Sequence, residues 1–344
     1  GPLRVAETER IRVMSPLLVP LPGHSVVRRF NGCWYRFVAR LAAKKLGFKQ
    51  PVLVNYVPTL AHAMRRWPGR VVYHCVDRWS AFEMYDSRLM AKMDACCCRW
   101  ADVVIASSSE LERQCRQHND NVHLVMHGVD REHFATALDR QERPADLPEG
   151  KIVGFFGLLS EWMDQDLVVE LARALRTGGG RRKEAQEDAR GDHGDCTSHN
   201  ASGASVVLIG TADVDVGKMR DMENIHLLGP KPFAELPRYI AHFDVGMIPF
   251  VVNELTAAVN PIKLREMMAA GCPVVSTALP EVKRLATEGV DVVSSREAFV
   301  RQVCECLSHP LEAESRRTLS DRMRRETWEH KTAEIVRIIE GAAS

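Results

Sequence analysis

The sequence predicts an α/β protein with two doubly wound domains, each a parallel sheet covered by helices. Short apolar segments alternate with helical stretches from residue 51 onward, and the same alternation restarts at residue 151. The expected strands are apolar on both faces, as in parallel sheets whose connections are helices. A length of 344 residues also suits two domains that each bury a core of their own.

The first half contains four apolar segments with the length of strands, at 51–58, 71–77, 101–108 and 121–130. Helical stretches at 59–67 and 84–100 connect them. The charged, proline-containing segment 140–150 is typical of a linker between domains. We therefore expect a first domain over residues 1–145.

The second half repeats the pattern with expected strands at 151–157, 205–210, 224–229, 244–250 and 273–277. Its expected helices are 166–176, 233–242, 261–270, 296–307 and 312–342. A polar, glycine-rich stretch over 178–205 lacks the apolar content to pack and predicts a disordered insertion. Its His193, Cys196 and His199 are interpreted as incidental and not as metal ligands. We expect a second domain over 146–326 and a final helical segment over 327–344.

The helix expected at 261–270 carries the most informative group of residues. Asn260 is a good N-cap residue and Pro261 fits the first helical position, so free N–H groups and the positive end of the helix dipole face the ligand edge of the sheet. Lys263 in the first turn suits a diphosphate, and Glu266 one turn on suits ribose hydroxyls. An ordinary amphipathic helix with a surface Lys–Glu pair fits the spacing equally well.

The stretch from Asn224 to Pro280 resembles the donor-binding core of the group 1 (family 4) glycosyltransferases, which are mostly retaining enzymes of GT-B fold. The resemblance extends to residues 101–111, 122–134 and 153–167, and to Glu326-Thr327-Trp328 near the C-terminus. Within the family, the chain is most similar to the branch that builds bacterial surface polysaccharides, including rhamnosyltransferases. The resemblance implies two Rossmann-like domains facing each other across a cleft, with the last helix crossing back to the first domain.

The resemblance also implies roles for individual residues of the second domain. Glu266 matches the second glutamate of the family's E-x7-E motif and would bind the donor ribose, whereas the first glutamate falls on Ala258, which puts the usual sugar contact in doubt. The loop backbone at Gly154 and Gly157 would approach the phosphates. Residues after the next two strands would flank the nucleobase: Gly210, Thr211, Lys231 and Phe233. Phe233 equally suits a core position at a helix start.

Three side chains at strand ends are candidates for the reaction itself: His74, Asp77 and His127. A retaining transfer needs no strong protein base, because the leaving diphosphate can accept the proton of the acceptor. His127 would then contact the sugar or the phosphate. Asp77 would contact the acceptor, or act as the base if the enzyme inverts. Each of these residues would also suit a purely structural role as a loop cap.

The N-terminal region is strongly basic although the whole chain has a net charge of only +1. Residues 1–70 contain thirteen Lys or Arg and two acidic residues, Glu7 and Glu9. Within 27–46, aromatic and aliphatic residues recur at helical spacing beside arginines, which suits an anionic membrane surface or a lipid-diphosphate acceptor. A core-packing helix with solvated arginines is the alternative. Compared with the resembled family, this first domain is short at its start.

Together these features predict a glycosyltransferase that moves a sugar from a nucleotide-sugar to a glycan or lipid-linked acceptor in surface polysaccharide synthesis. A GT-B epimerase or hydrolase and a catalytically silent GT-B binding protein are the alternatives. A nicotinamide enzyme is disfavoured because no G-x-G-x-x-G follows a strand. We expect no cofactor, no metal and no nucleic-acid partner. The lack of a spanning apolar run predicts a cytoplasmic protein, or one held peripherally at the inner face of the cell membrane.

Overall fold

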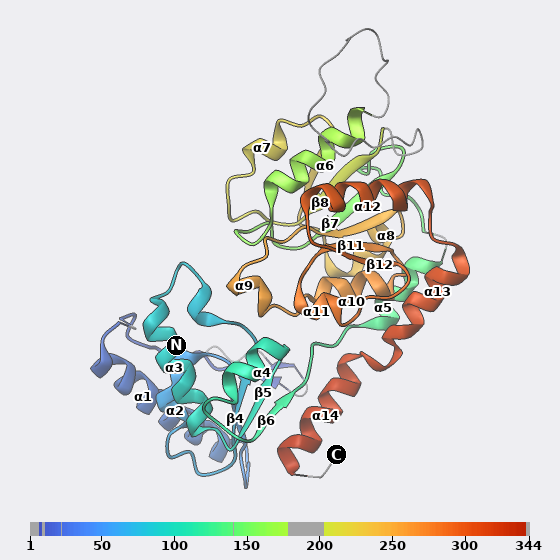
Figure 1. Ribbon diagram of the computed structural model, residues 1–344. Coiled ribbons are helices and arrows are strands. Elements are labelled where there is room, and N and C mark those ends of the chain that lie inside the picture. The colour runs from blue at the N-terminus through green and yellow to red at the C-terminus, as the bar shows by residue number, and fades with distance from the viewer. Residues whose placement is uncertain (1–6, 9–10, 22, 140, 178–202, 342–344) are drawn as a thin grey trace. The chain divides into compact units, whose positions relative to one another are not determined.

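The computed structural model describes residues 7–8, 11–21, 23–139, 141–177 and 203–341 (Figure 1). Most of the expected insertion at 178–205, with His193, Cys196 and His199, lies outside these residues. The chain divides into a first unit, Gly1–Met126 with Ala333–Ser344, and a second unit, His127–Thr332. The division falls before the expected boundary at residue 145, because the segment after Met126 pairs with residues of the second unit: Val129 forms a parallel β-bridge with Thr327.

The first unit is built on a four-stranded parallel sheet of order β3-β4-β5-β6. Its strands are β3 (Leu53–Asn55), β4 (Val71–Cys75), β5 (Val103–Ala106) and β6 (Val122–Leu124). Its helices are α1 (Ser25–Lys45), α2 (Ala61–Met64), α3 (Ser87–Trp100) and α4 (Ser109–Cys115), with short 3-10 turns η1 (Pro58–Leu60) and η2 (Trp79–Ala81). A small antiparallel pair, β1 (Glu7–Thr8) and β2 (Ile11–Arg12), precedes them. The four expected strands are thus confirmed, although each is shorter than its apolar segment.

The last helix, α14 (Trp328–Glu340), completes the core of the first unit. On the face of the sheet that α14 covers, four buried residues of β4, β5 and the end of β6 form a cluster: Val72, Val103, Ile105 and Val125. Three isoleucines of α14 pack against this cluster: Ile335, Ile338 and Ile339. Apolar side chains spaced three and four apart on a helix lie on one face, which explains the contact. The helix therefore starts in the second unit and ends in the first.

Helix α1 buries its polar and small residues and exposes its apolar side. Arg28, Asn31 and Gly32 are the buried positions of the helix. A Cβ on Gly32 would lie 2.4 Å from the Cβ of His62, so only glycine lets α1 approach α2 this closely. Phe30 and Phe37 remain 58% and 59% exposed, and Trp34 and Leu41 are exposed as well. The alternative of a core-packing aromatic face is therefore wrong.

The second unit has a six-stranded parallel sheet of order β12-β11-β10-β7-β8-β9. The strands are β7 (Ile152–Phe156), β8 (Ser205–Ile209), β9 (Ile225–Gly229), β10 (Val245–Ile248), β11 (Val274–Thr277) and β12 (Val290–Val293). The five expected strands are confirmed, and β12 at the sheet edge is an addition. β12 is half-buried and interrupted by Asp291, so its short pattern gives little apolar signal.

Helices cover this sheet as the alternation predicts (Figure 1). They are α5 (Arg131–Ala135), α6 (Gln165–Thr177), α7 (Gly217–Arg220), α8 (Leu236–Ile240), α9 (Glu254–Ala257), α10 (Ile262–Ala269), α11 (Pro280–Lys283), α12 (Arg296–Ser308) and α13 (Ala313–Asp321), with 3-10 turns η3 (Thr136–Leu138), η4 (Phe233–Glu235) and η5 (Arg322–Arg325). The single helix expected over 312–342 is wrong. The helix is interrupted at η5. There the Val129 amide donates a hydrogen bond to the Glu326 carbonyl and Val129 forms a β-bridge with Thr327, so these residues do not continue the helical hydrogen-bond pattern.

Candidate functional site

The loops after β7 and β8 are joined at two glycines. The Gly157 amide donates to the Ile209 carbonyl at 2.7 Å, and the Gly210 amide donates to the Gly229 carbonyl at 2.9 Å. Both glycines have positive φ, 129° and 149°. A Cβ on Gly210 would lie 1.8 Å from the Gly157 oxygen, so no other residue fits there. The structure therefore brings Gly157 and Gly210 together at the carboxyl edge of the sheet.

Lys263 on α10 lies directly against this pair of glycines. A Cβ on Gly157 would sit 1.8 Å from the Lys263 Cε and 2.5 Å from its Nζ. Burial lowers the pKa of Lys263, and the nearby Glu266 carboxylate partly offsets that shift. Gly157 thus makes room for an ammonium group at the point where the two loops meet. A partly buried ammonium group beside a glycine loop is an arrangement that suits a phosphate group.

Glu266 lies one helical turn after Lys263 and is half-buried. Burial raises the pKa of its carboxyl group to about 7, while Lys263 acts in the opposite direction. The group therefore changes its charge in the physiological pH range. Ionised, it accepts hydrogen bonds from hydroxyl groups, and protonated, it can donate one.

The prediction for Gly154 is corrected by its position inside β7. It lies in the buried strand, and a Cβ there would overlap the Phe243 ring at 2.1 Å. The absence of a side chain lets the aromatic ring pack onto the sheet. Gly154 therefore has a packing role, and the loop glycine beside Lys263 is Gly157 alone.

The prediction that Asn260 caps the helix is also wrong. The N-cap position is Pro261, without a side-chain cap bond, and α10 begins at Ile262. Asn260 is buried, and its Oδ1 instead accepts a hydrogen bond from Nη1 of Arg265 at 2.5 Å. Arg265 has no exposed surface, and its Nε lies 3.5 Å from Oε2 of Glu326. Sequence reasoning missed Arg265, because it stands among the charged residues Lys263 and Glu266 and nothing in the pattern distinguishes it as the buried one.

The loop before α10 is fixed by a short capped helix. The Asn253 side chain accepts from the Thr256 amide at 3.0 Å, and the Thr256 hydroxyl accepts from the Asn253 amide at 3.0 Å. This capping box orders α9. Ala258, which occupies the position of the expected first glutamate, follows α9 and is buried. Glu254, four residues before Ala258, is exposed at the start of α9.

Lys231 is already paired within the second unit. Its ammonium lies 2.6 Å from Oδ2 of Asp146 and 5.4 Å from the ring centre of Tyr239. The hydrogen bond to Asp146 raises the pKa of Lys231 despite its partial burial. The Lys231 ammonium therefore already has a carboxylate partner and an aromatic ring beside it. Thr211 is exposed in the loop after β8, where its carbonyl accepts from the Leu159 amide at 2.9 Å.

Phe233 lies on the surface and not in the core. It is 53% exposed and stacks on the ring of His133, with ring centres 4.5 Å apart. The core position considered from the sequence is therefore wrong. An exposed aromatic pair at the end of β9 is available to a planar ligand.

His74 and Asp77 both lie at the carboxyl end of β4 in the first unit. The His74 ring packs against Tyr56 with centres 4.9 Å apart, and burial lowers the pKa of His74 to about 4. Burial also raises the pKa of Asp77. The imidazole is therefore neutral at pH 7 and can exchange hydrogen bonds with a ligand without carrying charge.

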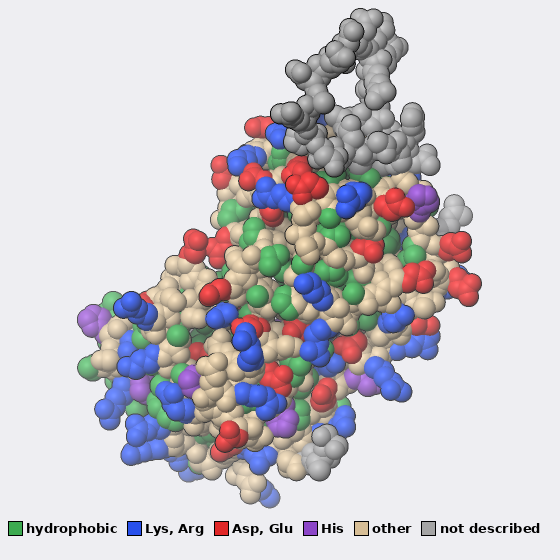
Figure 2. Space-filling view, viewed as in Figure 1, with side chains coloured by type: hydrophobic (Ala, Val, Ile, Leu, Met, Phe, Trp, Pro, Cys, Tyr) green, Lys and Arg blue, Asp and Glu red, His purple; other side chains and the backbone are tan. Residues whose placement is uncertain are grey.

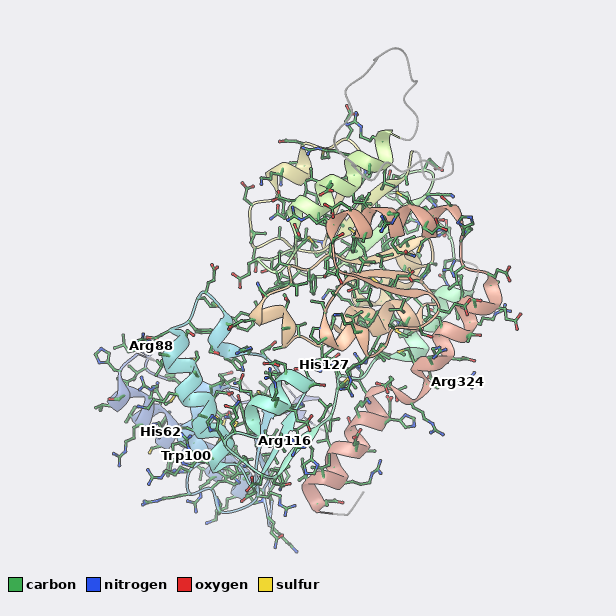
Figure 3. The ribbon with its side chains drawn as sticks, in the orientation of Figure 1. His62, Arg88, Trp100, Arg116, His127 and Arg324 are labelled. Carbon is green, nitrogen blue, oxygen red and sulfur yellow. The ribbon has the colours of Figure 1, made fainter. Side chains whose placement is uncertain are left out.

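His127 belongs to the second unit, although the sequence placed it at the end of the first domain. Its ring lies 6.2 Å from the Trp328 ring. His127, which is labelled in Figure 3, lies two residues before the bridge between Val129 and Thr327. Trp328 is the tryptophan that the family resemblance places at the start of the last helix. Among the residues that the structure describes, no cluster of three or more His, Cys, Asp or Glu could hold a metal ion.

Two units, each with a parallel sheet covered by helices, are the architecture of the GT-B fold. Residues 195–309 match the family model of the group 1 glycosyltransferases. The matched segment, about a third of the chain, is thus similar to the group 1 glycosyltransferases.

One curated relative of the chain is named for teichuronic acid biosynthesis. The chain is 24% identical over 239 residues to "Putative teichuronic acid biosynthesis glycosyltransferase TuaH" of Bacillus subtilis (strain 168). That match covers 66% of this chain and 54% of the relative, so the chain spans about half the length of the curated relative it matches.

Solved structures share the fold at low sequence identity. Anabaena Alr3699/HepE in complex with UDP and glucose has a TM-score of 0.63 and 14% identity, and the match covers 95% of this chain and 84% of that one. Sucrose-phosphate synthase from Thermosynechococcus elongatus has a TM-score of 0.67 and 14% identity over 100% and 86% of the two chains. TarM has a TM-score of 0.61 and 11% identity over 90% and 58%.

Proposed function

We propose that the protein is a glycosyltransferase that moves a sugar from a nucleotide-sugar donor to a glycan or lipid-linked acceptor in surface polysaccharide synthesis. The observation that carries this proposal is the contact of Lys263 with Gly157, where the loops after β7 and β8 meet. The match to a relative named for teichuronic acid biosynthesis and the likeness to a structure holding UDP support it.

In this proposal the second unit binds the nucleotide. The Lys263 ammonium beside Gly157 holds the diphosphate, and the Glu266 carboxylate accepts from the ribose hydroxyls. Because the diphosphate leaves as an anion, a fixed cation at Lys263 stabilises the charge that develops in the transition state. Gly210 and Thr211 flank the base, with Phe233 as a stacking surface.

The transfer is proposed to be retaining, with the leaving diphosphate as the acceptor of the proton. His127 then contacts the sugar or the phosphate. The neutral imidazole of His74 and the carboxyl group of Asp77 contact the acceptor. Were the enzyme to invert, Asp77 would be the base, and the raised pKa that burial gives its carboxyl group would suit that task. Comparing the anomeric configuration of donor and product by NMR decides between the two. Neither a metal nor a cofactor enters this scheme.

Calorimetric titration of UDP, GDP and dTDP tests the donor site. We expect at least one nucleotide to bind, and Lys263→Ala to weaken that binding about 10- to 100-fold, the usual effect of losing a charged hydrogen-bond partner. Arg301→Ala serves as the control because Arg301 is an exposed cation on α12, away from the glycine loops. If Lys263→Ala binds every nucleotide as the wild type does, the site is misplaced, and if no nucleotide binds at all, the function is wrong.

Product analysis separates transfer from the alternative functions. A transferase consumes the nucleotide-sugar only when a glycan or lipid-linked acceptor is present, and releases the nucleoside diphosphate. An epimerase or hydrolase converts the donor without any acceptor. A silent binding protein leaves the donor intact under both conditions, which would end the proposal of catalysis.

We further propose that α1 docks on an anionic membrane surface, such as the inner face of the cell membrane. Four exposed apolar residues lie along the helix beside basic ones: Phe30, Trp34, Phe37 and Leu41, with Arg29, Arg40, Lys44 and Lys45. Figure 2 shows Lys and Arg side chains gathered around this part of the first unit. Aromatic and basic side chains together favour the interface of an anionic bilayer. In the described residues, no helix is long and apolar enough to cross a membrane.

Sedimentation with vesicles tests the membrane proposal. We expect recovery with anionic vesicles but not with neutral ones, and a severalfold loss for the Trp34→Ser/Phe37→Ser variant. Met84→Ser is the control, because Met84 is an even more exposed apolar residue of the same unit, 78% exposed, but lies outside α1. Equal recovery of the wild type with anionic and neutral vesicles would exclude an electrostatic contribution to membrane binding.

A further inference from the structure

The chain passes between the two units at two places, and these crossing segments are paired with each other. The two passages fall at residues 126–127 and 332–333. We call the neighbouring segments of the second unit, residues 127–129 and 326–328, the first and second crossing segments. The Val129 amide donates to the Glu326 carbonyl at 2.9 Å, and Val129 and Thr327 form a parallel bridge. A Cβ on Gly128 would lie 2.7 Å from the backbone of Trp328, so the two segments touch without intervening side chains. A shift of one crossing segment therefore moves the other.

A buried guanidinium connects the crossing segments to the nucleotide helix α10. Arg265 is fully buried, and its Nε lies 3.5 Å from Oε2 of Glu326. The same Glu326 oxygen lies 3.1 Å from Nζ of Lys331 on α14. On its other side the Arg265 guanidinium holds Asn260 at 2.5 Å, in the loop that leads into α10. One side chain thus contacts both the entry to the nucleotide helix and the second crossing segment.

The burial of Arg265 favours concerted movement of Arg265 and Glu326. A guanidinium without access to water is strongly destabilised when its anionic partner leaves, so Arg265 and Glu326 favour moving together. Arg265 also stands between Lys263 and Glu266 in the sequence of a short helix, which moves as one body. Helix α10 additionally packs against α5, α13 and η5, the elements next to the two crossing segments. Displacement of Lys263 or Glu266 by a ligand therefore reaches Glu326.

We propose that Arg265 is a positioning residue that transmits nucleotide binding at Lys263 and Glu266 to the paired crossing segments through Glu326. This inference rests on the proposed nucleotide site. Glu326 does not touch the nucleotide in this scheme. Instead, Glu326 shifts when the nucleotide site is filled, and the backbone at Val129 and Thr327 shifts with it. The crossing segments therefore have two states, one without and one with bound donor.

Hydrogen exchange measured by mass spectrometry on the full chain tests the proposal, with the nucleotide that binds best in the titration at saturation. In the wild type we expect the nucleotide to slow exchange of the Val129 amide about fivefold or more. In Glu326→Gln the nucleotide should bind with an affinity within about twofold of wild type. The slowing at Val129 should be lost. Arg324→Ala is the control, because Arg324 is an exposed residue near the second crossing segment that pairs only with Asp321 in the described contacts.

Further variants keep the test decisive if Glu326→Gln folds poorly. Arg265→Met/Glu326→Leu replaces the buried ion pair by apolar side chains, a change that preserves folding in other proteins. It should bind nucleotide without slowing exchange at Val129. Lys331→Met keeps the Arg265–Glu326 pair and should behave like the wild type.

The outcomes separate the two claims. A wild-type protein that binds nucleotide with no change at Val129 overturns the inference and leaves the donor site intact. Unchanged slowing in both Glu326→Gln and the double variant also overturns it. A protein that binds no nucleotide overturns the donor site and the inference together.

Discussion

The two units use the same alternation of strands and helices but bury their apolar residues differently. In the second unit one continuous core cluster surrounds the six-stranded sheet. In the first unit the sheet has four strands, and most of the exposed large apolar side chains of the described chain lie in this unit. They include residues of α1 and of the edge strand β3, such as Phe37 and Val54. Similar sequence patterns therefore lead to one unit with a closed core and to another with an exposed apolar face.

The cause of the difference can be traced to α1. Its inward positions are Arg28, Asn31 and Gly32, and the Asn31 side chain bonds to the backbone of Val19 on both its donor and acceptor sides. These contacts fix the rotation of the helix so that its aromatic side turns outward. Periodicity predicts that a helix forms, whereas local polar contacts decide which of its faces is covered.

The largest expected effect is in the core of the second unit. Phe243 is 1% exposed and packs onto Gly154, so Phe243→Ala should lower the free energy of unfolding of this unit by about 4 kcal/mol. Because two units need not unfold together, the loss should be followed by hydrogen exchange at β7 and β10. A loss below about 1 kcal/mol would mean that the closed core is looser than its burial indicates.

The next effect is acid sensitivity of the first unit. The folded state holds the pKa of His74 near 4 by burial, while the unfolded chain protonates His74 near its ordinary value. The stabilising contribution is present above about pH 6.5 and is lost as the pH falls toward 4, by about 3 kcal/mol in total.

Chemical denaturation of wild type and His74→Gln between pH 7 and pH 4 measures this contribution. The variant should lose the part of the pH dependence that belongs to His74. If the free energy of unfolding depends on pH in the same way for both proteins, His74 is solvated in the folded state.

A smaller effect concerns nucleotide affinity in the second unit. Because burial raises the pKa of Glu266 to about 7, its carboxylate is largely protonated at pH 6 and ionised at pH 8. Affinity should therefore fall about tenfold between pH 8 and pH 6. Protonation of the nucleotide phosphate contributes to any titration in this range. Glu266→Gln retains only that contribution, so the difference between the two calorimetric profiles isolates Glu266, and identical profiles would contradict its role.

The smallest effect is expected on the open face of the first unit. Phe37→Ser should change the free energy of unfolding by no more than about 0.5 kcal/mol, because the ring is 59% exposed. Thermal or chemical denaturation without lipid measures it. A loss comparable to that of Phe243→Ala would show that another part of the protein covers α1 in solution, and would remove the contrast between the units.

The sequence predicted the parts of the fold that short-range pattern determines. Strands β4, β5, β7 and β8 are continuous apolar segments, and Lys263 and Glu266 stand at a helix start in a recognisable motif. Their roles in binding remain predictions. The features that the sequence did not predict depend on contacts between distant residues.

Three of these features show the physical reason. Asn260 looks like a cap, but buried Arg265 takes its side-chain oxygen. The segment after Asp321 looks helical, but Val129 pairs with Thr327 and ends the helix. Gly154 looks like a loop glycine, but the Phe243 ring occupies the space beside it. In each case a partner many residues away competes with the local preference and prevails.

The packing of α14 has a consequence for the order of protein synthesis. The strands of the first unit leave the ribosome early, but the isoleucines that cover Val72, Val103, Ile105 and Val125 lie at residues 335–339. Domains near the N-terminus ordinarily fold first during translation. Here the unit that is made first stays uncovered on one face until nearly the whole described chain has been made, and a nascent chain must protect that apolar surface for the time taken to translate the second unit.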